Sequence, residues 1–309
     1  MLALMLLVPA ACRNEPASPA ADQTSPSASP SPSPSATASA PDPVQPQLPR
    51  GGRKVFPRYQ LVSFVGFPGS PALGPFDSDL EARAARLERQ AVPYASGRVV
   101  QPVMELIVVI ANGHPGPDRK YRSRLDDAEI DRYLAVARRH KLLMLLDIQP
   151  GRADPLTEIK RFERYLSQPD IGLAFDPEWA VGPRETPGEV YGHTSGTELN
   201  SIAAYLSGLV VENDLPEKVF VFHQLSRRIV STEMALKPQP GVVTIKSVDG
   251  IGQMADKLIT WHKLTPRLAP GVHAGFKLFF DEDTRRRGKL MTPTQVLALK
   301  PRPELVTYE

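Results

Sequence analysis

The sequence predicts an α/β protein whose folded part is an eight-stranded (β/α)8 barrel of the TIM-barrel class. Residues 54–309 match the length of about 250 residues that is typical of this barrel. They contain eight apolar segments of strand length that alternate with amphipathic segments of helical period, and no low-complexity break divides them. A doubly wound open parallel sheet has the same alternation and is the alternative fold.

The composition of the 309-residue chain excludes several other classes of protein. Its 37 Lys and Arg residues nearly balance its 34 Asp and Glu residues, and the net charge of +3 does not indicate a nucleic-acid partner. The single cysteine rules out an intramolecular disulfide framework and a cysteine-based zinc site. No cofactor is expected, and the chain is expected to be a monomer.

The N-terminal region predicts export rather than folded structure. Residues 1–11 form a short apolar run, and Cys12 follows the small residues Ala10 and Ala11. This arrangement resembles the lipobox of bacterial lipoproteins, which implies lipidation at Cys12, whereas a plain cleavable signal is the alternative. Residues 13–53 are rich in Pro, Ser and Ala and poor in large apolar side chains, so we expect a disordered tether. A cell-surface lipoprotein or a secreted protein is therefore expected.

Eight apolar segments are predicted to form the parallel strands of the barrel. They are residues 60–66, 103–111, 142–148, 172–176, 219–223, 242–248, 274–280 and 305–308. Segments with apolar residues at helical spacing lie between them and are predicted to be helices. These are residues 77–90, 126–140, 155–167, 197–213, 253–263 and 293–299.

Helix start signals agree with these assignments. Residues 123–126 and 194–197 supply Ser, Thr and Asp as candidate N-caps, and Pro155 and Pro293 stand where the first helical turn tolerates proline. The fifth crossover, residues 226–241, is short and irregular, and no final helix is expected after the eighth strand.

Polar residues gather where the predicted strands end, which is where barrel enzymes place their active sites. Candidate catalytic residues are Asp147, Asp176 and Glu178. Candidate substrate-binding residues are Trp179, Gln149, His223, Gln224, Asp249, Lys277, Asp281 and Tyr308. Glu105 falls early in its strand and is expected to be a buried pair partner or a residue of the lower barrel layer rather than a catalyst. The histidines show no metal-ligand spacing, so no metal site is expected.

Strand alternation indicates which of these side chains share a face. Residues two apart point the same way, so Ala174, Asp176 and Glu178 share one face, and the large residues Leu173 and Phe175 face the helices. By the same parity, Leu145, Asp147 and Gln149 share a face on the preceding strand, and Lys277, Phe279 and Asp281 share one on the seventh. We expect these faces to meet in one cavity.

The segment GLAFDPEW, residues 172–179, resembles the fourth strand of chitinase-type (family 18) glycosidases, which ends in an acidic D-x-E pair. In that family the glutamate protonates the leaving oxygen and the aspartate stabilises an oxazolinium intermediate. The resemblance therefore implies these roles for Glu178 and Asp176. Gly172 and Ala174 depart from the family pattern, which has acidic residues there. More broadly, the chain resembles glycoside-hydrolase-like barrels of bacterial surface lipoproteins.

The leading hypothesis is a surface-anchored glycoside hydrolase that acts on a cell-wall or environmental glycan by carboxylate acid/base chemistry. Its partners would be a polysaccharide or other glycan and the membrane, reached through the lipid anchor at Cys12. A non-catalytic glycan- or ligand-binding lipoprotein is one alternative. A lyase or aldolase that uses Lys246 or Lys277 as a Schiff-base amine is another.

Overall fold

The computed structural model describes residues 45–309, apart from the side chain of Arg286. The predicted signal segment 1–12, its lipidation site Cys12 and residues 13–44 of the predicted tether lie outside the described residues.

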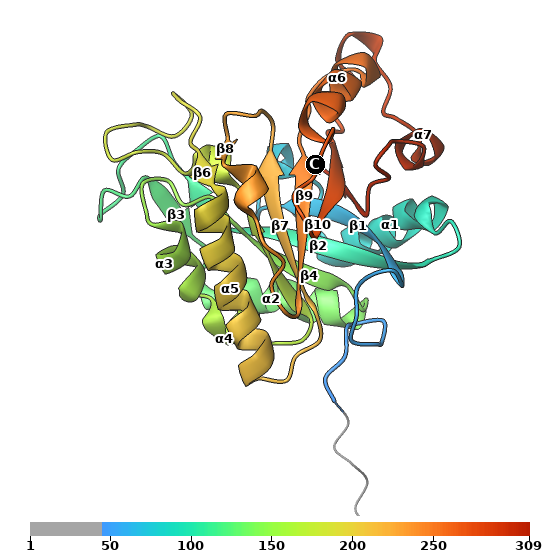
Figure 1. The fold of residues 1–309 in the computed structure, drawn as a ribbon, viewed down its shortest axis with the longest axis horizontal. Coiled ribbons are helices and arrows are strands. Elements are labelled where there is room, and N and C mark those ends of the chain that lie inside the picture. The colour runs from blue at the N-terminus through green and yellow to red at the C-terminus, as the bar shows by residue number, and fades with distance from the viewer. Residues whose placement is uncertain (1–44) are drawn as a thin grey trace, which may run out of the picture. The chain divides into compact units, whose positions relative to one another are not determined.

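Eight parallel strands close into a barrel, which confirms the predicted fold (Figure 1). The strands are β1 (Tyr59–Gly66), β2 (Val99–Ala111), β4 (Leu143–Ile148), β5 (Ile171–Phe175), β7 (Lys218–Gln224), β9 (Val242–Val248), β10 (Val272–Leu278) and β11 (Leu305–Tyr308). Each pairs in parallel with the next in this order, and β1 pairs with β11 as well as with β2. This last pairing closes the sheet, so the doubly wound open sheet is excluded.

Helices follow most of the strands and lie outside the barrel (Figure 1). They are α1 (Leu80–Ala91), α2 (Asp127–Arg139), α3 (Pro155–Lys160), α4 (Glu163–Leu166), α5 (Gly196–Glu212), α6 (Met254–Leu264) and α7 (Pro293–Leu297). Predicted start signals are in place: the Asp126 carboxylate accepts from the Glu129 amide, and the Ser195 hydroxyl accepts from the Glu198 amide. The single helix predicted for residues 155–167 is instead the pair α3 and α4.

Short elements complete the connections. Strand β3 (Arg122–Arg124) pairs antiparallel with the end of β2, and β6 (Thr194–Ser195) pairs with β8 (Val230–Ser231). The fifth crossover holds only β8 and a 3₁₀ turn, η4 (Glu233–Ala235), in agreement with its irregular sequence. Within residues 45–309, no helix has the length and apolar character needed to cross a membrane.

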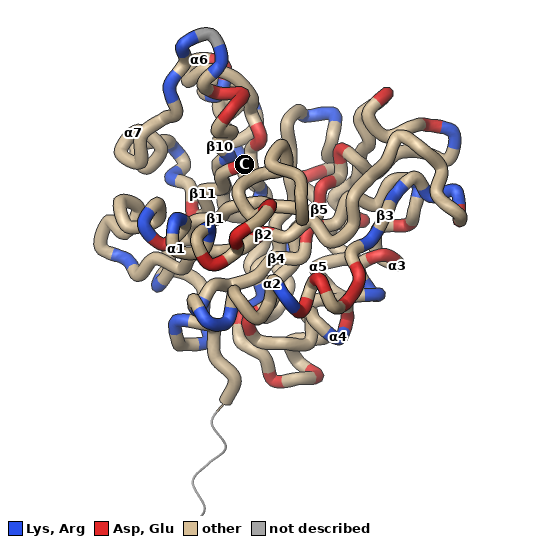
Figure 2. Tube along the Cα trace, turned by 180° about the vertical axis from the view of Figure 1, so that it is seen from behind, with Lys and Arg blue, Asp and Glu red and all other residues tan. Residues whose placement is uncertain are grey.

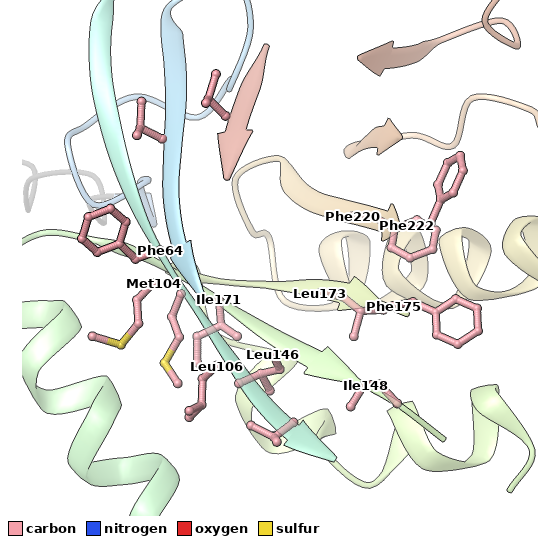
Figure 3. Packing of buried hydrophobic residues seen from close by; sticks show 14 of the residues in the cluster. Phe64, Met104, Leu106, Leu146, Ile148, Ile171, Leu173, Phe175, Phe220 and Phe222 are labelled. Carbon is pink, nitrogen blue, oxygen red and sulfur yellow. The ribbon is translucent and has the colours of Figure 1, made fainter. Parts of the chain in front are cut away.

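Two apolar clusters follow from strand alternation. Leu146, Leu173 and Phe220 point outward from neighbouring strands and pack with the helices (Figure 3). Leu145 and Val221 point into the barrel and belong to a smaller inner cluster. Because both faces of every strand are covered, the strands read as nearly continuous apolar runs in the sequence.

The folded domain begins before residue 54, so the predicted boundary is corrected. Leu48 is only 4 % exposed and packs with Val55 in the inner cluster. The Arg53 guanidinium donates to Asp214 at 2.7 Å and to the Leu215 carbonyl at 3.0 Å. Residues 45–53 are therefore part of the domain. Burial of the Leu48 side chain against the inner apolar cluster removes apolar surface from water and favours this arrangement.

Acidic and basic residues are interspersed over the helices and loops (Figure 2). Many form surface ion pairs, such as Arg138 with Asp170 and Arg132 with Glu129. This mixing agrees with the near balance of charges in the sequence.

Candidate active site

The interior of the barrel changes from apolar to polar toward the C-terminal ends of its strands. Leu145 on β4 and Val221 on β7 belong to the inner apolar cluster. Asp147 and His223, two residues further along the same strands, are polar and at most 2 % exposed. Period-two alternation thus places a layer of polar side chains on top of the apolar one.

A cleft of about 200 Å³ lies at this polar end of the barrel. Seven of the predicted site residues line it: Asp147, Gln149, Asp176, Glu178, Trp179, Asp249 and Lys277. The expectation that the faces of the third, fourth and seventh predicted strands meet in one cavity is therefore confirmed. The three predicted catalytic carboxyl groups share that cavity.

Asp176 and Glu178 reach the cleft from the turn that follows β5. Pro177 begins a short 3₁₀ helix, η3 (Pro177–Trp179), so the chain leaves the strand at Asp176, whose side chain does not cap η3. Gln149 Nε2 donates to Asp176 Oδ2 at 3.3 Å. The buried atoms Asp176 Oδ1 and Glu178 Oε2 accept no hydrogen bond from any described residue. These two oxygens therefore remain available to a ligand in the cleft.

Burial raises the pKa values of all three carboxyl groups, and the charge of Asp176 raises those of Asp147 and Glu178 further. Burial, followed by the charge of Asp176, raises the pKa of Glu178 well above its ordinary value. The same two causes raise the pKa of Asp147. Burial raises the pKa of Asp176 to about 6, although the positive charges of His223 and Lys277 oppose it. A carboxyl group that keeps its proton near neutral pH can donate it, so the cleft holds candidate general acids.

A buried ionic network lies beneath these carboxyl groups. His223 Nδ1 lies 2.8 Å from Asp249 Oδ2, and His223 Nε2 lies 3.1 Å from Glu105 Oε1. Lys277 Nζ lies 3.3 Å from Asp249 Oδ2 and 2.7 Å from Glu309 Oε2. Burial opposes the charge of Asp249, but Lys277 and His223 lower the pKa of its carboxyl group well below the ordinary value. Glu105 is 0 % exposed and is a buried pair partner, as its early position in the strand predicts.

The two lysines proposed as Schiff-base amines are both engaged in ion pairs. Burial disfavours the charge of Lys277, but Asp249 and Glu309 outweigh it and raise the pKa of Lys277 well above its ordinary value. Lys246 faces the helix layer, where its ammonium pairs with Glu233 at 2.8 Å. Schiff-base formation needs a neutral amine. The geometry therefore disfavours the lyase or aldolase alternative.

Tyr308, a predicted binding residue, does not line the cleft. Its hydroxyl lies 2.7 Å from the Tyr94 hydroxyl and accepts a hydrogen bond from Gln90 Nε2 at 2.9 Å, in the layer between barrel and helices. Thr307 takes the inward position instead, because it stands in register with Ser63 on β1 and with Lys277 on β10.

Gln224 and Asp281 also lie outside the cleft. Gln224 faces away from the barrel interior, since it follows the inward-facing His223, and its Nε2 donates to the Ser226 carbonyl at 3.1 Å. Asp281 comes after the end of β10 and lines a neighbouring cleft of about 440 Å³. The two clefts share Glu282 and Glu309, so Asp281 stands at the margin of the site.

Several residues that line the cleft are not among the predicted site residues. Glu309 follows β11 and pairs with Lys277. It follows a predicted strand and carried the same positional signal as the residues that were chosen. Leu73 lines the cleft from the 3₁₀ turn η1 (Pro71–Leu73) and carried no such signal. Phe279, directly after β10, lines the cleft as expected from the face that it shares with Lys277.

Comparisons with known proteins add a likeness of fold only. No protein-family model matches the chain, and no curated protein matches it. Similar solved structures include that of a hyperthermophilic endo-beta-1,4-glucanase in complex with substrate. It has 11 % sequence identity and a TM-score of 0.34, and the match covers 68 % of this chain and 77 % of that one. A likeness at this level carries no argument about function, and the barrel is established by the strand pairing itself.

Proposed function

We propose that the protein is a glycoside hydrolase in which Glu178 donates a proton to the leaving oxygen and Asp176 assists it. The observation that carries this proposal is the shared cleft. Glu178 and Asp176 each place a carboxyl oxygen in it without a hydrogen-bond donor among the described residues. A glycosidase requires two carboxyl groups at one site, one of them protonated.

The protonation states support a division of roles between the two groups. The pKa of Glu178 is raised well above its ordinary value, and that of Asp176 rises only to about 6 because His223 and Lys277 offset part of its burial. Glu178 therefore favours its protonated form more strongly than Asp176 does. This matches an acid paired with an anionic group that stabilises positive charge developing on a sugar ring.

Aromatic rings beside the carboxyl groups fit a sugar ligand. Trp179 follows Glu178 directly and lines the cleft, as does Phe279, which comes directly after β10. Large aromatic side chains provide flat apolar surface at little entropic cost. The neighbouring cleft of about 440 Å³ shares Glu282 and Glu309 with the site, so a chain of sugar units has room to continue along this end of the barrel.

The test is hydrolysis of a panel of cell-wall and plant glycans, measured as the release of reducing ends. Glu178→Gln should lower kcat/KM by about a hundredfold or more, because it removes the proton and keeps the shape. Glu189→Gln is the matched control, since Glu189 is exposed on the loop after the same strand. Equal activity of the Glu178→Gln variant would overturn the assignment. Tight binding of one glycan without hydrolysis by the wild type would favour the non-catalytic binding protein.

We also propose, from the sequence alone, that the protein is exported and anchored through a lipid on Cys12. The support is the apolar run before the only cysteine and the Pro/Ser/Ala-rich segment after it. Cell fractionation of wild type and Cys12→Ser tests this directly. The wild type should stay with the membrane fraction and the variant should enter the medium. Release of both proteins to the same extent, or a cytoplasmic location, would contradict the anchor.

A further inference from the structure

Three side chains from different strands converge inside the barrel beside the cleft, which Asp147 lines. They are Glu105 on β2, Asp147 on β4 and His223 on β7, and each is at most 2 % exposed. One nitrogen or oxygen atom from each lies within 4.8 Å of the other two. The separation of Glu105 Oε1 and His223 Nε2 is 3.1 Å. Two ligands bound at about 2.1 Å to one metal ion stand about 3.0–3.4 Å apart, so this pair already has the spacing of neighbouring ligands.

One of the three groups has no partner within the described part of the chain. Asp147 Oδ1 is buried and makes no hydrogen bond to a described residue. Glu105 Oε1 and His223 Nε2 are also buried, and they face each other at 3.1 Å, which pairs them only when the ring carries a proton on Nε2. A buried polar atom without a partner costs about 1–3 kcal/mol, so Asp147 Oδ1 is expensive to bury unless something else binds it. This is the independent sign of a ligand, beyond the presence of acidic residues.

The surrounding side chains hold the three groups in the orientation that a metal ion requires. Asp249 Oδ2 lies 2.8 Å from His223 Nδ1. This contact orients the ring so that Nε2 points toward Glu105. Ser247 Oγ donates to Asp249 Oδ1 at 2.7 Å, and Ser63 Oγ donates to Glu105 Oε2 at 3.3 Å. Carboxylates that bind the far nitrogen of a ligating histidine are the usual outer partners of metal sites.

We propose that Glu105, Asp147 and His223 bind a divalent first-row transition ion inside the barrel beside the cleft. One imidazole nitrogen and two carboxylate oxygens form a donor set that suits Zn²⁺ or Mn²⁺, whereas Ca²⁺ and Mg²⁺ prefer oxygen alone. The two ligand carboxylates balance the charge of the ion, and Lys277 balances Asp249. With three protein ligands, further positions face the cleft and are open to water or substrate.

The structure also offers a competing arrangement without an ion. A doubly protonated His223 would lie between the carboxylates of Glu105 and Asp249 as a buried ion pair. That arrangement leaves Asp147 Oδ1 without a partner among the described residues. The two states differ in the protonation of His223 Nε2, which can be measured.

Titration of the chelator-treated full chain with Zn²⁺ and with Mn²⁺, followed by calorimetry, tests the site. We expect one ion per chain with at least one of the two metals and a rise in melting temperature. Glu105→Gln and Asp147→Asn keep the side-chain shape and should each weaken binding by about tenfold or more. Glu233→Gln is the control, because Glu233 pairs with Lys246 on the outer face of the barrel. Absence of binding, or equal weakening in the control, would overturn the site.

A measurement on the wild type keeps the test decisive if the variants fail to fold. In ¹⁵N NMR spectra of protein with labelled histidine, Nε2 of His223 should lose its proton when the ion is added, and its resonance should shift. A His223 ring that stays doubly protonated with the ion present would overturn the proposal. Glu178→Gln should abolish glycan hydrolysis and retain ion binding, so the proposed function and the metal site succeed or fail separately.

Discussion

His223 and Asp249 meet across 2.8 Å at the centre of the polar layer, with Nδ1 of the ring facing Oδ2 of the carboxylate. Lys277 approaches the same carboxylate oxygen at 3.3 Å. The lowered pKa of Asp249 keeps its carboxyl group ionised, so the His223 ring donates from Nδ1 and presents Nε2 to Glu105. One buried carboxylate thereby positions a histidine and a lysine that come from two other strands.

Replacing this carboxylate should destabilise the protein strongly. Asp249→Asn removes the buried carboxylate charge that Lys277 and His223 share and leaves each with one other carboxylate, Glu309 or Glu105. Breaking a buried pair costs about 3–5 kcal/mol. Urea unfolding followed by circular dichroism measures the change. Asp214→Asn serves as control, because Asp214 pairs with Arg53 at the surface, where the loss should stay below about 1 kcal/mol. Similar losses for both variants would mean that the buried network adds no special stability.

The proposed acid should reduce stability at neutral pH. Glu178 has a pKa raised above its ordinary value in the folded state, so the folded chain retains a proton that the unfolded chain releases. Wild-type stability therefore falls as the pH rises through the window between the two pKa values. Glu178→Gln should melt at the same or a higher temperature than wild type at pH 7, and the difference should vanish below the ordinary pKa. A melting temperature clearly below wild type at pH 7 would contradict the raised pKa.

Lys218 should make stability rise with pH above neutrality. Burial lowers the pKa of Lys218 from 10.5 to about 7, although the charge of Asp170 opposes it. The Lys218 amine donates to the carbonyls of Gln168 and Ile171. Between these values the unfolded chain binds a proton that the folded chain does not, so the free energy of unfolding rises with pH by at most about 1.4 kcal/mol per unit. Unfolding at pH 7, 8 and 9 measures the slope. Lys218→Met should remove it, whereas Lys237→Met, at an exposed position, should leave it unchanged.

Tyr308→Phe should affect stability and spare activity. The change removes a hydroxyl that bonds to Tyr94 and Gln90 in the outer layer, and a buried hydroxyl left with fewer partners costs about 1–2 kcal/mol. Thermal unfolding and glycan hydrolysis measured on the same preparation check both parts. Tyr191→Phe, at a residue that is 70 % exposed, should change neither. Loss of turnover in Tyr308→Phe without loss of stability would show that the Tyr308 hydroxyl has a role in activity.

Two truncations should differ in stability. A chain that starts at residue 45 retains Leu48, whose burial in the inner cluster contributes about 2 kcal/mol, whereas a chain that starts at residue 54 loses it. The second chain also loses the contact of Arg53 with Asp214. Differential scanning calorimetry of both chains and of full-length Leu48→Ala tests this. Equal melting temperatures for the two truncated chains would show that residues 45–53 contribute nothing to the fold.

Strand positions and much of the site were predictable from the sequence, for a physical reason. A barrel strand is buried on both faces, so each of the eight strands is an apolar run that ends where its polar residues begin. Alternation then places Asp147 on the same face as Leu145 without any knowledge of neighbours. Asp176 and Glu178 reach the cleft from the turn after β5, which strand alternation does not describe. The carboxyl groups of the cleft were identified by their positions at the ends of predicted strands.

Tertiary structure decided what depends on pairing between strands. Thr307 rather than Tyr308 faces inward because β11 is in register with Ser63 and Lys277 on its two neighbours. The order of residues along one strand cannot reveal that register. The convergence of Glu105, Asp147 and His223 is of the same kind. These residues have no motif spacing in the sequence, and only closure of the sheet brings their strands around one point, where burial makes each unsatisfied polar atom costly.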